Sequence, residues 1–357
     1  MNLRLSIYAV AAAALIAGAW VALRPPVLPE FPAIGAAPGA PVAAPGPARP
    51  ETATAAAAGA RPANPLGVAK VPVRATLFNE YLQARQYRAI YDRLLSPPVG
   101  ETAEGRLVLY EILRNCATVT EGRRYRWGPR TPSREQFLAG LPATDPQRDR
   151  RIAAFEEFTA DRCAGFEGVA LTQAALDKML ADAAAAGDPR ARAMAIEQAL
   201  WIERRNQGRN SATISDDQIA ELKQVLSSRD PEAIRVAGRV LSNSWADYSL
   251  RLGPDQVPVE QRAFMNAWLV LACEFGQPCG ADTPRMQQAC AINGYCDAQS
   301  FPDYLYYYGS SPHDSQLLVQ YRAYLRQALE SGDWSQLGVV RGVPTTGRRV
   351  TFVPGPR

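Results

Sequence analysis

Two Asp-Pro dipeptides that lie 42 residues apart constrain how the centre of this 357-residue chain can fold. The stretch "DPRA" at 188–191 aligns with "DPEA" at 230–233. Asp is a favoured helix N-cap and Pro suits the first helical position, so each dipeptide predicts the start of a helix. Small residues recur at the same offset, as in Ala195 and Ala237. The pattern predicts a degenerate repeat of helical hairpins over residues 171–245.

The helix expected before each Asp-Pro turn carries a start signal of its own. Thr172 precedes a stretch whose apolar residues recur at helical spacing as far as Gly187. Ser215 and Gln218 match a capping box at the start of the corresponding helix in the second hairpin. Both halves of the repeat are therefore expected to be helix-turn-helix units.

Further helices are expected towards the C-terminus. Pro258 is expected to begin one helix, and Ser311-Pro312 another. No convincing run of strands precedes the tail. The chain is thus predicted to be all-α, with one helical domain over residues 74–337 that contains a Cys-rich segment at 273–296.

The hairpin sequences resemble those of known repeat families. "AAAAGDPRARAMA" and "RDPEAIRVAGRVL" are similar to the seams of Sel1-like, tetratricopeptide and HEAT-type repeats, although the 42-residue period is longer than that of Sel1-like repeats. The resemblance covers residues 171–245 only. It implies an irregular, α-solenoid-like stack of hairpins that acts as a binding scaffold. The Cys-rich part also resembles uncharacterised exported proteins of proteobacteria, a likeness that implies no activity.

The N-terminus predicts export of the rest of the chain. About 19 uncharged, mostly apolar residues follow Arg4 and end before Arg24, which is enough for one membrane-spanning helix. Residues 1–24 are therefore a signal anchor or a cleavable signal peptide, and "AGA" at 17–19 fits a cleavage site. The anchor is favoured because apolar residues continue past that site. We expect a single-pass inner-membrane protein whose C-terminal domain is periplasmic; the alternative is a cleaved, soluble periplasmic protein.

Two segments outside the domain differ from it in composition. Residues 25–73 are rich in Pro, Ala and Gly, and such a segment cannot bury enough apolar surface to offset the entropy of ordering it. We expect a disordered linker there. Residues 338–357 contain four Arg and no acidic residue, and we expect a basic tail that is mobile or forms an edge ribbon.

Six cysteines in an exported chain predict three disulfides. They are Cys116, Cys163, Cys273, Cys279, Cys290 and Cys296. The last four could pair in a nested order that clamps two antiparallel helices, or in a sequential or crossed order. The first two then remain for each other. Zinc binding is disfavoured because none of the spacings is a short C-x2-4-C knuckle, and a redox centre is disfavoured because C-x-x-C is missing.

Catalytic signatures are scarce. His313 is the only histidine, and neither a nucleophile elbow nor a phosphate-binding loop occurs. Two acidic pairs, at 156–157 and 216–217, are better explained as a charged helix surface and a helix first turn. We therefore expect no cofactor and no metal, and the sequence leans against an enzyme.

Two aromatic stretches are candidate binding patches. The first alternates arginines with aromatic residues, which can stack on sugars, peptides or anions. Its members are Arg123, Arg124, Tyr125, Arg126, Trp127 and Arg130. The second is a tyrosine cluster that could line a groove for a glycan or a peptide. Its members are Tyr304, Tyr306, Tyr307 and Tyr308.

The charge distribution argues against a nucleic-acid partner. The net charge is +4, and the tail accounts for it, so the rest of the chain is neutral overall. We expect a non-enzymatic interaction or scaffold protein of the cell envelope, attached to the membrane through the N-terminal helix, that binds an envelope protein. The alternative is a cell-wall-directed enzyme or glycan-binding module that uses one of the aromatic patches. The oligomeric state stays open.

Overall fold

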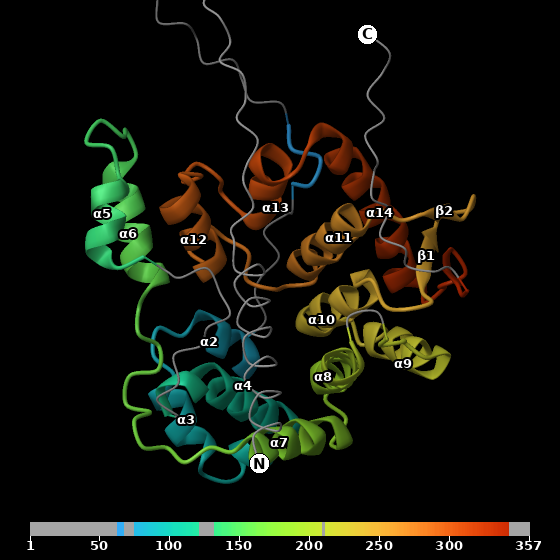
Figure 1. The fold of residues 1–357 in the computed structure, drawn as a ribbon, viewed down its shortest axis with the longest axis horizontal. Coiled ribbons are helices and arrows are strands. Elements are labelled where there is room, and N and C mark those ends of the chain that lie inside the picture. Colours follow the sequence, from blue (N-terminus) through green and yellow to red (C-terminus); the bar gives the residue numbers. More distant parts are fainter. Residues whose placement is uncertain (1–62, 68–74, 121–131, 209–210, 343–357) are drawn as a thin grey trace, which may run out of the picture. The chain divides into compact units, whose positions relative to one another are not determined.

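The computed structural model describes residues 63–67, 75–120, 132–208 and 211–342. Helices dominate these residues (Figure 1), which confirms the predicted all-α class at the level of secondary structure. The expected membrane segment at 1–24 and the arginine-aromatic patch lie outside the described residues, as do most of the linker and of the tail. None of the helices in the described ranges has both the length and the apolar character needed to cross a bilayer.

The N-terminal helices pack around one long helix. They are α2 (Leu77–Gln83), α3 (Arg88–Leu94), a 3-10 turn (Val99–Glu101) and α4 (Ala103–Thr120). The apolar side of α4 is fully buried, with Leu107, Val108 and Ile112 inaccessible to solvent. Helix α4 contacts α2 and α3 on one side and α7 on the other, so it joins the N-terminal helices to the repeat region.

The predicted hairpins are present. Their helices are α7 (Gln173–Ala185), α8 (Pro189–Gln207), α9 (Asp216–Leu226) and α10 (Pro231–Ser242). Each starts where the sequence indicated. The side chain of Asp188 accepts hydrogen bonds from two backbone N–H groups of α8, and Asp230 does the same at α10. The capping box of Ser215 and Gln218 is also formed.

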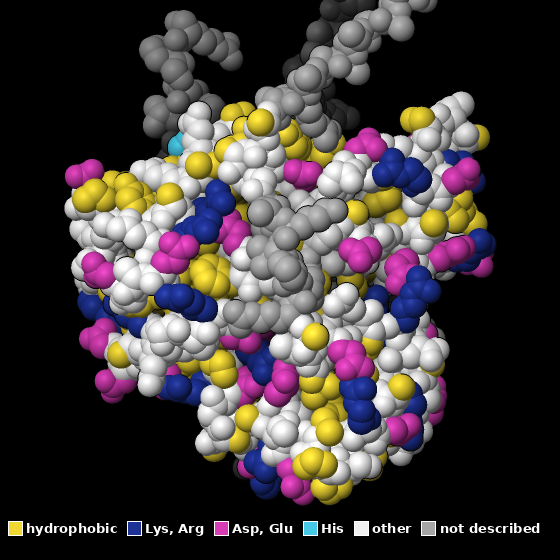
Figure 2. Space-filling view, turned by 180° about the vertical axis from the view of Figure 1, so that it is seen from behind, with side chains coloured by type: hydrophobic (Ala, Val, Ile, Leu, Met, Phe, Trp, Pro, Cys, Tyr) yellow, Lys and Arg dark blue, Asp and Glu magenta, His cyan; other side chains and the backbone are white. Residues whose placement is uncertain are grey.

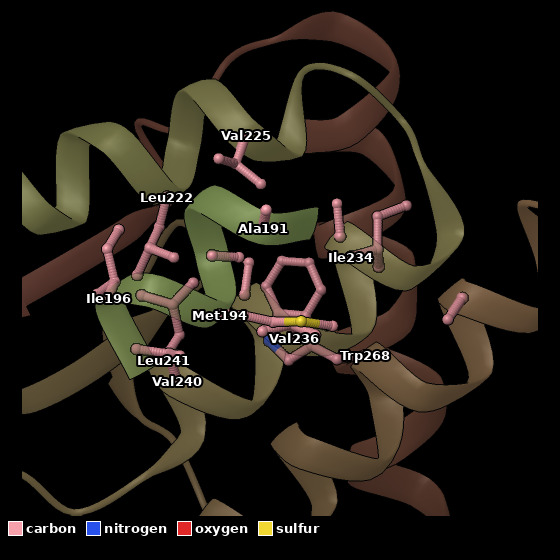
Figure 3. Packing of buried hydrophobic residues seen from close by; sticks show 14 of the residues in the cluster. Ala191, Met194, Ile196, Leu222, Val225, Ile234, Val236, Val240, Leu241 and Trp268 are labelled. Carbon is pink, nitrogen blue, oxygen red and sulfur yellow. The ribbon is translucent and has the colours of Figure 1, made fainter. Parts of the chain in front are cut away.

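Equivalent positions of the two hairpins face each other. Arg239 of α10 forms a bidentate ion pair with Glu197 of α8, which lies one 42-residue period earlier in the sequence. Met194 and Val236, another equivalent pair, lie in the main hydrophobic cluster together with Trp268 (Figure 3). The repeat therefore packs α8 directly against α10.

Helix α10 is buried on several sides, because it contacts α8, α9 and α11. Gly238 allows the closest of these approaches: a Cβ placed there would lie 2.2 Å from Cγ of Trp268. The absence of a side chain at this position lets the Trp268 indole of α11 lie directly on the α10 backbone.

The C-terminal helices begin partly where the sequence predicted. They are α11 (Gln261–Glu274), α12 (Pro284–Asn293), α13 (Phe301–Tyr304), a π-helical turn, η2 (Leu305–Gly309), and α14 (Pro312–Ser331). Ser311 caps α14 as expected. The start expected at Pro258 is wrong, since α11 begins at Gln261 and Pro258 belongs to a strand.

Two short strands contradict the expectation of no strand before the tail, and a third lies at the start of the tail. They are β1 (Ser249–Leu252), β2 (Val257–Pro258) and β3 (Leu337–Val340), in the antiparallel order β2-β1-β3. Strands of two to four residues are too short to show a reliable alternating pattern. The ordered domain also extends past 337, because β3 takes in the first residues of the expected tail as an edge strand.

A smaller helical group lies beside the main core. It consists of α5 (Arg134–Gly140), α6 (Arg148–Phe158) and α12, which share the apolar cluster around Phe137 and Phe155. Figure 1 shows α6 next to α12 although more than a hundred residues separate them. Arg151 of α6 donates to the backbone carbonyls of Ala291 and Ile292 at the end of α12, and this holds the two helices together.

The six cysteines form three disulfides, and the nested arrangement is wrong. Cys116 pairs with Cys163, as expected by elimination. The other bridges are sequential, Cys273–Cys279 and Cys290–Cys296. Nested bridges would need α11 and α12 to pack as an antiparallel pair, whereas α12 packs mainly on α6. Each short bridge instead ties the end of a helix to the loop that follows it.

Replacing Gly238 by Ala should lower the free energy of unfolding by about 1–3 kcal/mol, because the new methyl group must displace Trp268. Urea denaturation would measure this. Gly140→Ala is the matched control: a Cβ there meets nothing within 4 Å, so that variant should be neutral or slightly stabilised. Equal stabilities of the two variants would contradict the close approach.

Peptide mapping without reduction should separate the two short disulfides. Trypsin cleavage after Arg285 divides the Cys-rich segment between Cys279 and Cys290. Sequential bridges leave the two halves as separate fragments, each with an internal bond. Recovery of one fragment joined across the cleaved site would instead show nested or crossed pairing.

Candidate functional site

The end of the expected linker is bound to the domain. Leu66 is inaccessible to solvent and lies in an apolar cluster with Val270, Phe301 and Leu318. The Asn64 amide donates to Asp303 Oδ1 at 2.6 Å, which places residues 63–67 against α13. The expectation that all of residues 25–73 are disordered is therefore wrong for this segment. Leu66 is buried in an apolar cluster of the domain, and the composition of the linker gives no sign of this contact.

The backbone of this segment is held as well. Arg322 of α14 donates from Nη1 to the carbonyl oxygen of Pro65 at 3.1 Å, and also pairs with Glu274 of α11. The backbone N–H of Leu66 donates to Asn64 Oδ1 at 2.8 Å, which forms a tight turn. The domain thus holds a short peptide turn through one apolar anchor and a few polar contacts.

A groove of about 620 Å³ lies beside this docked segment and includes part of the predicted tyrosine cluster. We call it the tyrosine groove. Its lining residues are Pro65, Tyr306, Tyr307, Ser310, Pro312, Ser315, Gln316 and Val319. No charged side chain is among these described lining residues. Aromatic rings, proline rings and a few hydroxyl and amide groups make a surface suited to uncharged, extended ligands.

Local sequence explains how the tyrosines reach the groove. Ser300 caps the short helix α13, and the chain then continues as the π-helical turn η2. Isolated π-helical turns are frequent at functional sites. The rings of Tyr306 and Tyr307 meet edge to face with centroids 5.1 Å apart. The Arg262 guanidinium donates to the carbonyl oxygen of Gly309 at 2.9 Å, which fixes the end of the turn.

One polar atom of the tyrosine groove has an unmet hydrogen-bonding capacity. Ser310 Oγ is buried, and it has no hydrogen-bond partner among the residues that the structure describes. A buried hydroxyl without a partner costs free energy, so a ligand that hydrogen-bonds to it would be favoured.

The other two tyrosines of the predicted cluster do not line this groove. Tyr304 and Tyr308 pack against Tyr295, whose ring stacks on that of Tyr308 at a centroid distance of 4.7 Å. Tyr295 in turn lines a second groove, of about 580 Å³, between α2, α6 and the Cys-rich segment. We call it the polar groove. Only Tyr306 and Tyr307 of the predicted cluster therefore line the tyrosine groove, while Tyr304 and Tyr308 support the Tyr295 ring.

The polar groove contains charges of both signs. Arg85 and Glu157 form an ion pair across its wall. Arg150 pairs with Asp297 beside it. Figure 2 shows the same mixture over a whole face of the molecule, where Lys and Arg alternate with Asp and Glu. Because these cations already have carboxylate partners, the polar groove offers hydrogen bonds rather than a strong net charge.

The acidic pairs and the histidine from the sequence lie at the surface. Glu156 and Glu157 pair with arginines of α5 and of the α2–α3 loop, and Asp216 pairs with Arg341. His313 is exposed and hydrogen-bonded to Glu260, a contact that raises its pKa. Among the residues that the structure covers, no group of three His, Cys, Asp or Glu side chains could hold a metal ion.

Sequence reasoning missed a buried carboxyl group. Glu111 of α4 is only 5 % exposed, and burial raises its pKa. Arg114 donates to its Oε2 at 2.9 Å, and the Tyr81 hydroxyl lies 3.4 Å from the same oxygen. Its Oε1 has no partner within the described part of the chain. The sequence does contain a signal for this buried group, because Glu111 is the single acidic residue in the apolar stretch "LVLYEIL".

Comparisons with protein-family models, with curated proteins and with solved structures find no match to this chain. A function for this chain must therefore be inferred from its own geometry, above all from the tyrosine groove and the polar groove.

The stability of the protein should depend on pH through Glu111. Its pKa is raised above the ordinary 4.5 in the folded state, so the folded state retains a proton that the unfolded chain loses as pH rises. The free energy of unfolding, relative to that of Glu111→Gln, should therefore fall as pH increases from about 4.5 through the raised pKa. Urea denaturation at a series of pH values would measure it.

Glu167→Gln, which changes an exposed glutamate, is the matched control and should show no such trend. A difference that grows with pH would mean that the pairing with Arg114 outweighs burial.

Proposed function

We propose that the domain is a non-enzymatic interaction module that binds an extended, uncharged segment of a protein partner in the tyrosine groove. One observation carries the proposal: the groove is continuous with residues 63–67, a short uncharged peptide that the same surface already holds as a turn. Pro65 belongs both to the docked peptide and to the lining of the groove.

The contacts of the docked peptide indicate how a partner would be recognised. Leu66 is the apolar anchor, Arg322 binds a backbone carbonyl, and Asp303 binds a side-chain amide. Next to them, Tyr306 and Tyr307 present aromatic surface suited to prolines and small apolar residues. Recognition of extended peptides commonly combines such pockets with donors to backbone carbonyls.

The uncharged lining favours an uncharged partner segment. An acidic or basic peptide would lose hydration of its charges in the tyrosine groove without finding opposite charges there. The buried hydroxyl of Ser310 and the amide of Gln316 instead suit the carbonyl and N–H groups of a peptide backbone.

The proposal includes the setting of the domain. We place it in the periplasm, attached to the inner membrane through residues 1–24. The three disulfides support an oxidising compartment. The irregular hairpin stack implied by the repeat resemblance would act as the scaffold that carries the groove.

A second candidate function is glycan binding in the polar groove. Its observation is the ring of Tyr295 beside arginine, glutamine and carboxylate side chains. Sugars bind by stacking on aromatic rings and by hydrogen bonds to such polar groups. We rank it second, because the partnered charges of the polar groove would have to give up existing contacts.

The groove can be tested by photo-crosslinking in cells. A benzoylphenylalanine at Gln316, inside the tyrosine groove, should crosslink to one defined segment of a protein partner. The same substitution at Gln320, an exposed glutamine four residues further along α14 but outside the groove, should not. Crosslinks from both sites to the same proteins, or crosslinks only to wall fragments, would overturn the proposal.

A synthetic peptide of the crosslinked segment then supplies the quantitative test. It should bind the purified full-length protein, and Tyr307→Ala should weaken that binding about tenfold, as expected for loss of an aromatic contact of 1–2 kcal/mol. Trp201→Ala, which removes an exposed aromatic ring on α8, should leave the affinity unchanged. Unchanged affinity of Tyr307→Ala would exclude the groove as the binding site.

A further inference from the structure

A third cavity, of about 270 Å³, lies where the Cys-rich segment meets α10 and α11. We call it the arginine cavity, because two guanidinium groups line it, those of Arg235 and Arg285. It is separate from the tyrosine groove and shares no lining residue with it.

The two arginines differ in their partners. Arg235 of α10 is neutralised by Glu232, which accepts from its Nε at 2.6 Å and from its Nη2. Glu232 is buried and also accepts from the Gln277 amide at 3.0 Å, so its carboxylate is saturated. This pair therefore contributes almost no net charge to the cavity.

Arg285 has no carboxylate or other hydrogen-bond acceptor among the residues that the structure describes. Its guanidinium lies over the ring of Phe301, 3.7 Å from the centroid, and it remains accessible to solvent on the cavity wall. The surrounding protein removes part of the water from the Arg285 guanidinium, and this desolvation, together with the nearby charge of Arg235, lowers the pKa of Arg285 to about 10. Arg285 is still protonated at neutral pH, so one uncompensated positive charge faces the cavity.

The remaining wall is mostly apolar, with Gln277 and Thr283 as its polar members. Leu82, Leu269 and Phe301 contribute most of it, together with Pro278. The loop that carries Gln277 and Pro278 is closed by the Cys273–Cys279 disulfide, which holds this wall in place. The arginine cavity thus presents one unpaired cation beside a rigid apolar surface.

We propose that the arginine cavity binds a small monocarboxylate with an apolar tail, whose carboxylate pairs with Arg285. An arginine fork matches a carboxylate in a bidentate geometry. A second negative charge on the ligand is disfavoured, because Arg235 is already paired with Glu232 and no other cation lines the cavity among the described residues. The apolar tail packs on Leu82 and Leu269, and the size of the cavity limits the ligand to a short chain or a single ring.

Calorimetric titration of the full-length protein with hexanoate tests the proposal. Hexanoate should bind saturably, whereas hexanamide, a neutral ligand of nearly the same shape, should bind at least tenfold more weakly, as expected for loss of a charge-assisted hydrogen bond. Equal binding of the two ligands, or no binding of hexanoate, would overturn the proposal.

Arg285→Gln should weaken hexanoate binding by a similar factor. Arg204→Gln is the matched control, because Arg204 also stacks on an aromatic ring, that of Trp201, and also lacks an ion pair in the described ranges, but lies on α8 outside the cavity. That control should bind hexanoate as the unchanged protein does. Equal affinities of the two variants would exclude Arg285.

One measurement does not depend on the folding of a variant. Hexanoate should shift the Nε–Hε resonance of Arg285 in the unchanged protein, while the corresponding resonance of Arg204 should stay in place. Binding of hexanoate without a shift at Arg285 would place the ligand elsewhere and reject the site.

Discussion

A single buried arginine connects the N-terminal helices to the two hairpins. Arg190 donates to both carboxylate oxygens of Asp188, the cap of α8, and to Glu104 at 3.0 Å, with Asp230, the cap of α10, at 3.9 Å. Glu104 in turn accepts from the backbone N–H of Phe78 in α2. Burial opposes the charge of Arg190, but these carboxylates outweigh it and raise its pKa. Loss of the guanidinium would leave the buried carboxylate of Asp188 without its cation, and the partly buried Glu104 and Asp230 with it, at a cost of about 3–5 kcal/mol.

This cluster explains why the Asp-Pro turns matter beyond the helices that they start. Each Asp caps its own helix through local backbone contacts. The carboxylates of Asp188 and Asp230 also fix the spacing of α8 and α10, because both approach the guanidinium of Arg190. Further along these helices, Glu197 and Arg239 repeat the connection. The repeat therefore packs through matched polar contacts at both ends of the α8–α10 interface, with the apolar cluster of Figure 3 between them.

The candidate binding surfaces depend on a different part of the chain. Residues 275–310 contribute to all three, and these residues consist largely of loops and short helices. Loops of this kind need external support to keep a fixed shape. Two local disulfides, the contacts of α12 with α6, and the insertion of Leu66 supply it. The helical core thus carries a set of loops and short helices, held by two disulfides, on which the two grooves and the arginine cavity are formed.

The sequence by itself determined the starts of the four repeat helices and of α14, the 42-residue repeat and the Cys116–Cys163 bridge, because caps, helical periodicity and elimination among cysteines need only local or combinatorial information. Tertiary structure alone decided the sequential disulfides, the docking of Leu66, the presence of only two of the four clustered tyrosines in the tyrosine groove and the unpaired state of Arg285. Each of these depends on which distant segments pack together. A local pattern places a side chain on a helix or a turn, but its neighbours across the fold decide whether it faces a core, a partner charge or an open cavity.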